Sequence, residues 1–165
     1  MFLLGHVGIG TRMLGPLRRR LPARPLILGC LLPDLIDKPL YYLLPGNPLI
    51  LGSRTFGHTG LFLLALLLLA LLARRPWTWA LFAGVATHLL LDIAGEFFTG
   101  ADPDSSIWRA VFWPALGAFP VAHFETLLEH LRLSAHSEWV WAGEIAGGAI
   151  LLVAWLSRRR ARQSP

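Results

Sequence analysis

Residues 58–73, HTGLFLLALLLLALLA, form an almost unbroken leucine run that ends at Arg74, Arg75 and Pro76. A soluble domain would have to bury every face of such a helix, whereas a lipid bilayer accepts an apolar surface all round. The same constraint extends to the whole chain, because hydrophobic residues make up 55% and charged residues only 15%, against about 25% charged in soluble domains. The sequence therefore predicts an all-α, polytopic membrane protein.

Five apolar segments are candidates for membrane helices, for which about 20 residues are needed to cross the hydrocarbon core. They are residues 2–17, 25–44, 58–73, 77–93 and 139–156. Tryptophan, which favours the bilayer interface, marks the start of the last two. The second is expected to be broken by prolines and charges, which a membrane tolerates where a helix lines a cavity. An apolar stripe at helical spacing over Val121–Leu133 predicts a short amphipathic surface helix.

The distribution of arginines predicts how the chain is oriented. They cluster at 12–24, 74–75 and 158–162, beside apolar segments, which indicates cytoplasmic loops rather than a nucleic-acid face. A short basic tail that binds RNA is the alternative for 158–162. With all three clusters inside the cell, the N-terminus lies outside and the C-terminus in the cytoplasm. We expect one membrane-embedded domain, 1–165, with 158–165 as a basic cytoplasmic tail.

Several ionisable side chains fall inside the expected spans, where each costs roughly 2.5–3.5 kcal/mol on insertion scales and therefore needs a reason. Counting about 1.5 Å of helix rise per residue from the basic end of each segment places most of them roughly 15–24 Å away. Separate helices would thus bring them to one layer toward the outer face of the membrane. They are His6, Asp34, Asp37, His58, His88 and Asp92; Glu144 is a further buried charge, for which the sequence suggests no partner.

The spacing of these groups predicts a shared metal ion. His88 and Asp92 lie about one helical turn apart, so their side chains can bind one ion or orient each other. Asp34 and Asp37 are similarly spaced, and two carboxylates that close repel each other unless a cation lies between them. Nitrogen and oxygen ligands of this mix suit a divalent ion, zinc first, with manganese, iron or magnesium as alternatives. The single cysteine, Cys30, excludes a cysteine-based zinc site.

Each pattern also has a simpler interpretation when taken alone. Asp34 and Lys38 have the i,i+4 spacing of an ordinary salt bridge. His58 could be an interfacial residue at the end of a span, and HxxxD could be a buried hydrogen-bonded pair. The remaining histidines belong to amphipathic or loop segments and are interpreted as surface groups without a catalytic role: His123, His130 and His136.

An ordered set of motifs resembles a known family. His6 is followed by PDLIDKP at 33–39, GSRTFGHT at 52–59, GVATHLLLD at 84–92 and WP at 113–114. Over residues 1–120 or so this order resembles the YdjM-like family of inner-membrane metal-dependent hydrolases. The resemblance implies a multi-span helical protein with a divalent metal and a hydrolytic activity whose substrate is generally unassigned.

The motifs depart from the family pattern at two positions. Many members have a tighter PDxD, and many have a histidine at the position of Ser53, so one ligand of a two-metal site is missing here. The order of histidines and aspartates is more distantly similar to the zinc-dependent phospholipase C and nuclease P1 group. That similarity favours phosphoesters as substrates.

These observations together predict a hydrolase that uses a metal-activated water. Arg54 would hold a substrate phosphate or, alternatively, extend to the interface, and Glu96, one turn beyond Asp92, would be a general base. Expected partners are the bilayer and a phospholipid or lipid-linked phosphate, but no nucleic acid. The alternatives are an ion-handling or transport protein and a non-catalytic adaptor whose Gly143 and Gly147 pack against another helix.

Overall fold

The computed structural model describes residues 3–100, 102–122 and 126–163, and within these ranges all regular structure is helical. The all-α prediction is thereby confirmed. The helices follow one another as α1 (Leu3–Met13), η1 (Gly15–Arg20), α2 (Ala23–Leu43), η2 (Phe56–His58), α3 (Gly60–Ala73), α4 (Pro76–Thr99), α5 (Ile107–Val111), α6 (Leu127–Ala135) and α7 (Glu138–Gln163), where η denotes a 3-10 helix.

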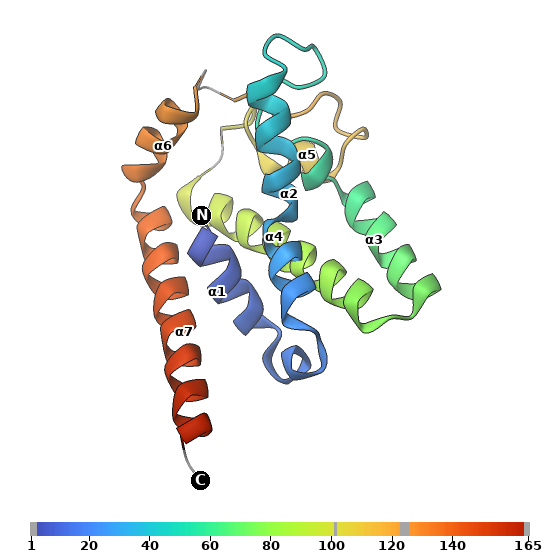
Figure 1. The fold of residues 1–165 in the computed structure, drawn as a ribbon. Helices are drawn as coiled ribbons and strands as arrows, with labels where there is room; N and C mark the ends of the chain where they lie inside the picture. Colours follow the sequence, from blue (N-terminus) through green and yellow to red (C-terminus); the bar gives the residue numbers. More distant parts are fainter. Residues whose placement is uncertain (1–2, 101, 123–125, 164–165) are drawn as a thin grey trace.

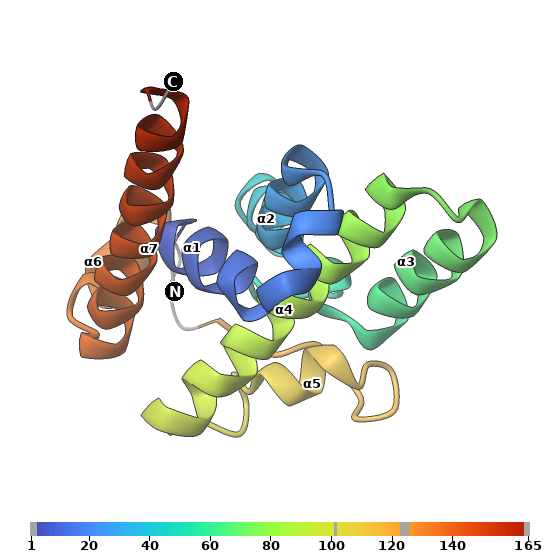
Figure 2. The same ribbon diagram turned by 90° about the horizontal axis from the view of Figure 1, so that it is seen from below.

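Three helices, α1, α2 and α4, meet in the middle of the molecule. Viewed from below, α3 and α7 lie on opposite sides of this group (Figure 2). Both outer helices turn many leucines and other large apolar side chains outward, among them Leu68 and Leu72 of α3 and Leu152 and Val153 of α7. An apolar surface of this kind is suited to lipid.

Glycines set the distance between the central helices α2 and α4. A Cβ atom on Gly29 would collide with the backbone of α4, and one on Gly84 would collide with the carbonyl oxygen of Leu26 in α2. Small residues at such a crossing let two backbones approach closely. The buried side chains of Val85 and Leu89 continue this contact toward α3.

The helices α1 and α7 form a second close pair. Gly8 and Gly147 face each other with no room for a Cβ on either. Gly147 thus packs against this chain's own α1. The carboxylate of Glu144 accepts hydrogen bonds from the amides of Leu4 and Gly5, at 3.0 and 2.8 Å, so the N-terminal turn of α1 is its partner.

Two described helices are long and apolar enough to cross a membrane, Pro76–Thr99 and Glu138–Ala161, and α3 is a shorter apolar helix. About five membrane helices are therefore not confirmed. With 11 residues, α1 is only about 16 Å long. The prediction of a broken second helix is wrong, because α2 continues through Pro33 and Pro39. A membrane helix can pass a proline where neighbouring groups satisfy the freed backbone carbonyl.

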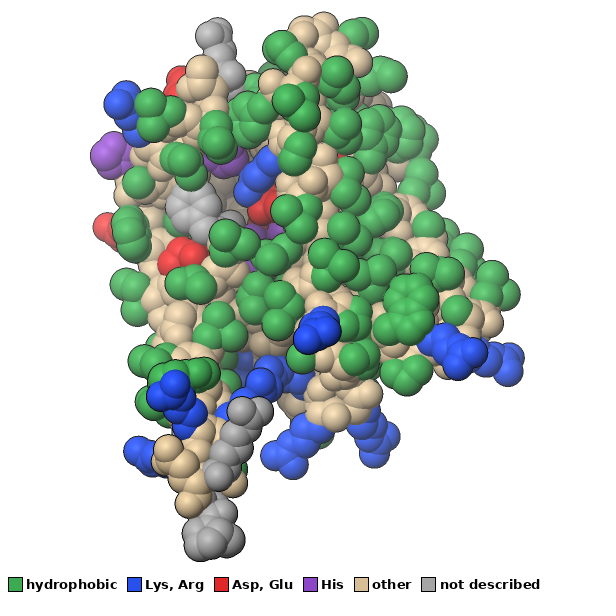
Figure 3. All heavy atoms as spheres, in the orientation of Figure 1, with side chains coloured by type: hydrophobic (Ala, Val, Ile, Leu, Met, Phe, Trp, Pro, Cys, Tyr) green, Lys and Arg blue, Asp and Glu red, His purple; other side chains and the backbone are tan. Residues whose placement is uncertain are grey.

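Most of the arginines gather at one end of the molecule, at the bottom of Figure 3. Those of this basic end include residues of η1, of the turn between α3 and α4, and of the end of α7. The amphipathic helix is α6, which begins at Leu127 and so starts later than predicted. The helix α7 continues to Gln163 and so includes most of the expected basic tail, whose position in the cytoplasm stays a prediction. His123 lies outside the described residues.

Candidate metal centre

Four segments, α1, α2, η2 and α4, each turn polar side chains into one buried region. The helix α4 contributes His88 and Asp92, which lie on the same face and are both buried. The carbonyl oxygen of Cys30 in α2 lies 2.7 Å from His88 Nδ1. A carbonyl can only accept, so Nδ1 carries the hydrogen and Nε2 presents its lone pair. The Nε2 atom of His88 is therefore a potential ligand atom facing the centre.

His58 is oriented in the same way, by a carboxylate instead of a carbonyl. Its Nδ1 lies 2.7 Å from Asp37 Oδ2, and both residues are fully buried. Asp37 also accepts from the backbone amides of Thr55, Gly57 and His58 and from the Thr55 hydroxyl. This network fixes the turn that holds η2 against α2. It also leaves His58 Nε2 pointing into the centre.

The two Nε2 atoms, of His58 and His88, lie 3.2 Å apart. Since both rings carry their hydrogen on Nδ1, two lone pairs face each other at hydrogen-bonding distance. This contact is repulsive unless a cation or an additional proton lies between the rings. Asp92 Oδ2 lies 3.5 Å and Asp34 Oδ1 3.8 Å from His58 Nε2, so negative charge surrounds the same point.

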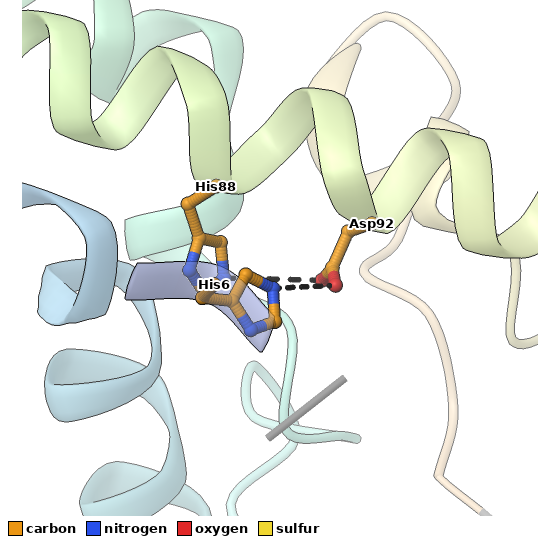
Figure 4. A group of neighbouring side chains, drawn as sticks. All are labelled: His6, His88 and Asp92. Atoms are coloured by element: carbon orange, nitrogen blue, oxygen red, sulfur yellow. Dashed lines mark hydrogen bonds and ion pairs between the residues drawn. The ribbon is translucent and has the colours of Figure 1, made fainter. Parts of the chain in front are cut away.

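His6 completes the cluster from α1. Its ring stacks on that of His88 with centroids 4.0 Å apart, and its Nε2 lies 3.2 Å from Asp92 Oδ1 (Figure 4). Gly10, one turn along α1, packs against Thr87 and Cys30, so α1 can approach α2 and α4 closely. The position of His6 therefore depends on how α1 is seated.

Two cations compete for the carboxylates at the edge of the cluster. Lys38 Nζ lies 2.6 Å from Asp34 Oδ2, and the two side chains are about one-quarter exposed. Arg54 Nε lies 3.4 Å from Asp92 Oδ2. The i,i+4 salt bridge between Asp34 and Lys38 thus exists, and Asp34 Oδ1 still faces His58.

Two overlapping sets of side chains could hold a metal ion, with all ligand atoms of a set within 4.8 Å of one another. The first is His6, His88 and Asp92; the second is Asp34, His58 and His88. Five of the six predicted ligands are therefore brought together. Asp37 belongs to neither set, because its oxygens are turned toward His58 Nδ1 and the backbone of the η2 turn.

Glu96 is oriented toward a different part of the chain. Its carboxylate accepts from the hydroxyl of Ser106 at 2.6 Å and from the amide of Ile107 at 2.5 Å. Both oxygens thus hold the start of α5. Glu96 lines a small cavity together with Arg54 and Asp92. Its predicted role as a general base stays a prediction.

A larger cavity, of about 520 Å³, opens above the carboxylates. Its walls come from α2, the 52–54 segment, the end of α4, the 120–122 segment, α6 and the first turns of α7. Asp34 and Asp92 lie in its lining together with the cations Lys38 and Arg54. Figure 3 shows basic, acidic and histidine side chains inside this hollow.

His130, which the sequence pattern assigned to the surface, also lines this cavity. Its Nδ1 lies 2.9 Å from the hydroxyl of Tyr42, which joins α6 to α2. Burial lowers the pKa of His130 to about 4, and the charge of Lys38 acts in the same direction. The ring is therefore neutral at pH 7. His136 is exposed, as predicted.

Comparison with known proteins gives one match. A family model described as YdjM inner membrane protein matches residues 1–161, a range that includes every residue of the cluster and nearly all of α7. No curated protein and no solved structure matches the chain at a significant level.

Proposed function

The chain belongs to the YdjM inner membrane protein family, and we propose that it is a metal-dependent hydrolase of that membrane. The substrate class we propose is an anionic phosphoester, carried by a phospholipid or another lipid-linked phosphate. The centre that would carry the reaction is the cluster of histidines and aspartates between α1, α2, η2 and α4.

One observation supports a metal ion above the others, the 3.2 Å contact between the Nε2 atoms of His58 and His88. An extra proton would also relieve the repulsion between their lone pairs. A divalent ion does so more fully, because it also balances the charges of Asp34 and Asp92 beside the same point. The mixture of imidazole and carboxylate donors suits zinc best and also suits manganese or iron.

The two ligand sets share His88, whose Nδ1 is already bonded to Cys30. One nitrogen lone pair binds one ion, so the sets describe alternative surroundings of a single ion rather than two complete sites. In this proposal Asp37 is not a ligand. It orients His58 from behind, as carboxylates behind metal-bound histidines commonly do.

The chemistry supplied by a bound divalent ion is a water acidified to a pKa of about 7 and a polarised substrate oxygen. The protein's own groups do the rest. Arg54 and Lys38, at the lining of the cavity above the carboxylates, would attract and orient a phosphate. Glu96 would keep α5 in place beside that opening.

The arrangement of charges also suits an enzyme that faces the outer leaflet. The basic clusters lie at one end and the histidine centre lies away from it (Figure 3). With the basic end in the cytoplasm, as the distribution of arginines predicts, the cavity opens toward the outer side of the membrane. A lipid phosphate could then reach Arg54 without leaving the bilayer surface.

The test uses detergent-purified protein and three variants, His88→Ala, Asp92→Ala and the exposed control His136→Ala. Metal content is measured by elemental analysis, and phosphate release is measured from phosphatidic acid in mixed micelles and from a soluble phosphomonoester. We expect bound metal and hydrolysis in the parent and the control, and loss of both in the two centre variants. Unchanged hydrolysis in His88→Ala and Asp92→Ala would overturn the proposal.

A further inference from the structure

A separate cavity, of about 370 Å³, lies at the basic end of the molecule. It is formed by η1 and Leu21 on one side and by the α3–α4 turn with the first turns of α4 on the other. None of its lining residues belongs to the histidine centre. It is therefore a separate feature of the fold.

The walls of this cleft are apolar and largely uncovered. Trp79 and Phe82 pack edge to face, with ring centroids 6.1 Å apart, and neither ring is fully buried. Leu17, on the opposite wall, is half exposed. Together they offer an aromatic and aliphatic groove to whatever lies outside the protein, and in a membrane that is lipid.

Two arginines, Arg20 and Arg74, also line the cleft. Within the part of the chain that the structure describes, neither forms an ion pair, and the lining contains no acidic residue. The helix α4, 24 residues long, begins at Pro76 in the same wall, so the positive end of its dipole adds to the two guanidinium charges.

We propose that this cleft binds an anionic phospholipid. The phosphate would lie between Arg20 and Arg74, and an acyl chain would follow Leu17, Trp79 and Phe82. One guanidinium group can donate two parallel hydrogen bonds to the oxygens of a phosphate. Basic pockets between membrane helices are suited to acidic lipid headgroups. A free phosphate would leave the apolar walls uncovered, and a zwitterionic lipid would bring no net charge to the two arginines.

The test is a lipid titration of the full-length, detergent-purified chain. Phosphatidylglycerol and phosphatidylcholine with the same acyl chains are added separately, and bound lipid is counted by native mass spectrometry. We expect phosphatidylglycerol to bind at least about tenfold more tightly, a difference of about 1.4 kcal/mol. No preference for phosphatidylglycerol in the parent protein would overturn the proposal.

The matched variants are Arg20→Gln with Arg74→Gln and, as control, Arg19→Gln with Arg75→Gln. Each pair removes two positive charges from the same two segments, but only the first pair lines the cleft. The first double variant should lose the preference for phosphatidylglycerol, whereas the control should keep it. Equal loss in both would mean general attraction of anionic lipid to a basic surface and would overturn a specific site.

Two further measurements distinguish binding of the whole lipid from binding of its phosphate alone. Ala83→Leu narrows the cleft without altering its charge and should weaken phosphatidylglycerol binding. Inorganic phosphate should not compete at millimolar concentration; full competition would mean that the cleft takes a phosphate without its lipid. Metal content of every variant checks that the distant histidine centre is intact, so failure of this proposal is distinct from failure of the proposed hydrolase.

Discussion

Two helix pairs of this molecule are assembled in similar ways but serve the candidate centre very differently. The helices α2 and α4 cross at Gly29 and Gly84, and α1 and α7 cross at Gly8 and Gly147. The first pair, with η2 seated on it, provides five of the six predicted ligands. The second pair provides only His6.

The difference lies in how each pair is held. The α2–α4 pair is tied internally by buried hydrogen bonds, through Cys30 to His88 and through Asp37 to the η2 turn. The short helix α1 packs on α2 and α4 through Gly10 but is also held by the carboxylate of Glu144, which comes from α7 far along the chain. The histidines of α4 and η2 are thus preorganised locally, whereas the position of His6 also depends on an outer, lipid-facing helix.

The largest effect is expected from Asp37→Asn, which disrupts the locally organised pair. Each oxygen of Asp37 accepts at least two hydrogen bonds. The asparagine side chain has an NH₂ group in place of one oxygen, and at either position this donor would face other donors and could not accept from them. Loss of such a partner behind a metal-binding histidine lowers metal affinity roughly 10–100-fold. Zinc affinity is measured by competition with a chelator.

The control for this variant is Asp104→Asn, which removes an exposed carboxylate that pairs with Arg109. It should leave zinc affinity unchanged. Wild-type zinc affinity in Asp37→Asn would mean that the η2 turn does not need its carboxylate, and the contrast between the two helix pairs would lose its physical basis.

A smaller effect is expected from Glu144→Ala, which loosens the other pair. Loss of a partner at a helix N-terminus costs about 0.5–2 kcal/mol, and only His6 among the proposed ligands belongs to α1. Zinc affinity should fall by no more than about 30-fold, which is the equivalent of 2 kcal/mol. Glu138→Ala, an exposed carboxylate at the start of α7, is the control.

A double-mutant cycle distinguishes positioning of His6 from a general loss of stability. If Glu144 acts through His6, Glu144→Ala should lower zinc affinity in the parent but not in a His6→Ala background. The absorption spectrum of the cobalt-substituted protein should change in the same way in the two single variants. Additive losses of affinity would show that Glu144 stabilises the fold without positioning His6.

A change of zinc affinity in the opposite direction, an increase, is expected from a substitution at the edge of the histidine and aspartate cluster. Lys38→Met removes the ammonium group that pairs with Asp34 and would compete with a metal ion for it, and it keeps an apolar side chain of similar length. Zinc affinity should rise, by up to about tenfold for 1.4 kcal/mol of lost competition, and affinity for inorganic phosphate should fall. Isothermal titration measures both, and a fall in both would indicate only a damaged fold.

The sequence predicted the structure correctly where the side chains themselves carried the signal, through their hydrophobicity or through the cost of their charge in an apolar segment. The leucine run predicted an apolar helix, and the cost of charges in apolar segments selected His6, Asp34, His58, His88 and Asp92, which the fold brings together. The sequence did not predict which oxygens face which donors. The carboxylate of Asp37 accepts from backbone amides of the η2 turn, and the spacing of residues in the sequence does not predict such contacts.

Two other features of the structure could not be predicted from the sequence, for related reasons. The acceptor that orients His88 is a main-chain carbonyl, which every residue has. The partner of Glu144 is likewise a pair of main-chain amides. The number of membrane helices was not confirmed, because helix length was inferred from hydropathy and α1 ends at Met13 although Leu14 and Leu17 continue the apolar pattern.

The smallest effect on the centre is expected from the pH dependence of α6, which belongs to neither pair. Burial and the positive charges of Lys38 and Arg54 lower the pKa of His130 to about 4, although Asp34 acts in the opposite direction, against about 6.5 in an unfolded chain. As the pH falls, the unfolded form therefore takes up a proton on His130 at a higher pH than the folded form does. Stability from the neutral ring is therefore full above about pH 6.5 and is lost as the pH falls toward 4.

Hydrogen exchange tests this dependence directly. Exchange of the α6 amides, corrected for the intrinsic rate at each pH, should accelerate between pH 7 and pH 5 in the parent but stay level in His130→Gln, whose side chain can still bond to Tyr42. The amides of α4 should not follow that change if α6 is joined to the rest chiefly through this contact. The same acceleration in His130→Gln would place the sensitive group elsewhere, and acceleration in α4 as well would mean that α6 and the α2–α4 pair open together.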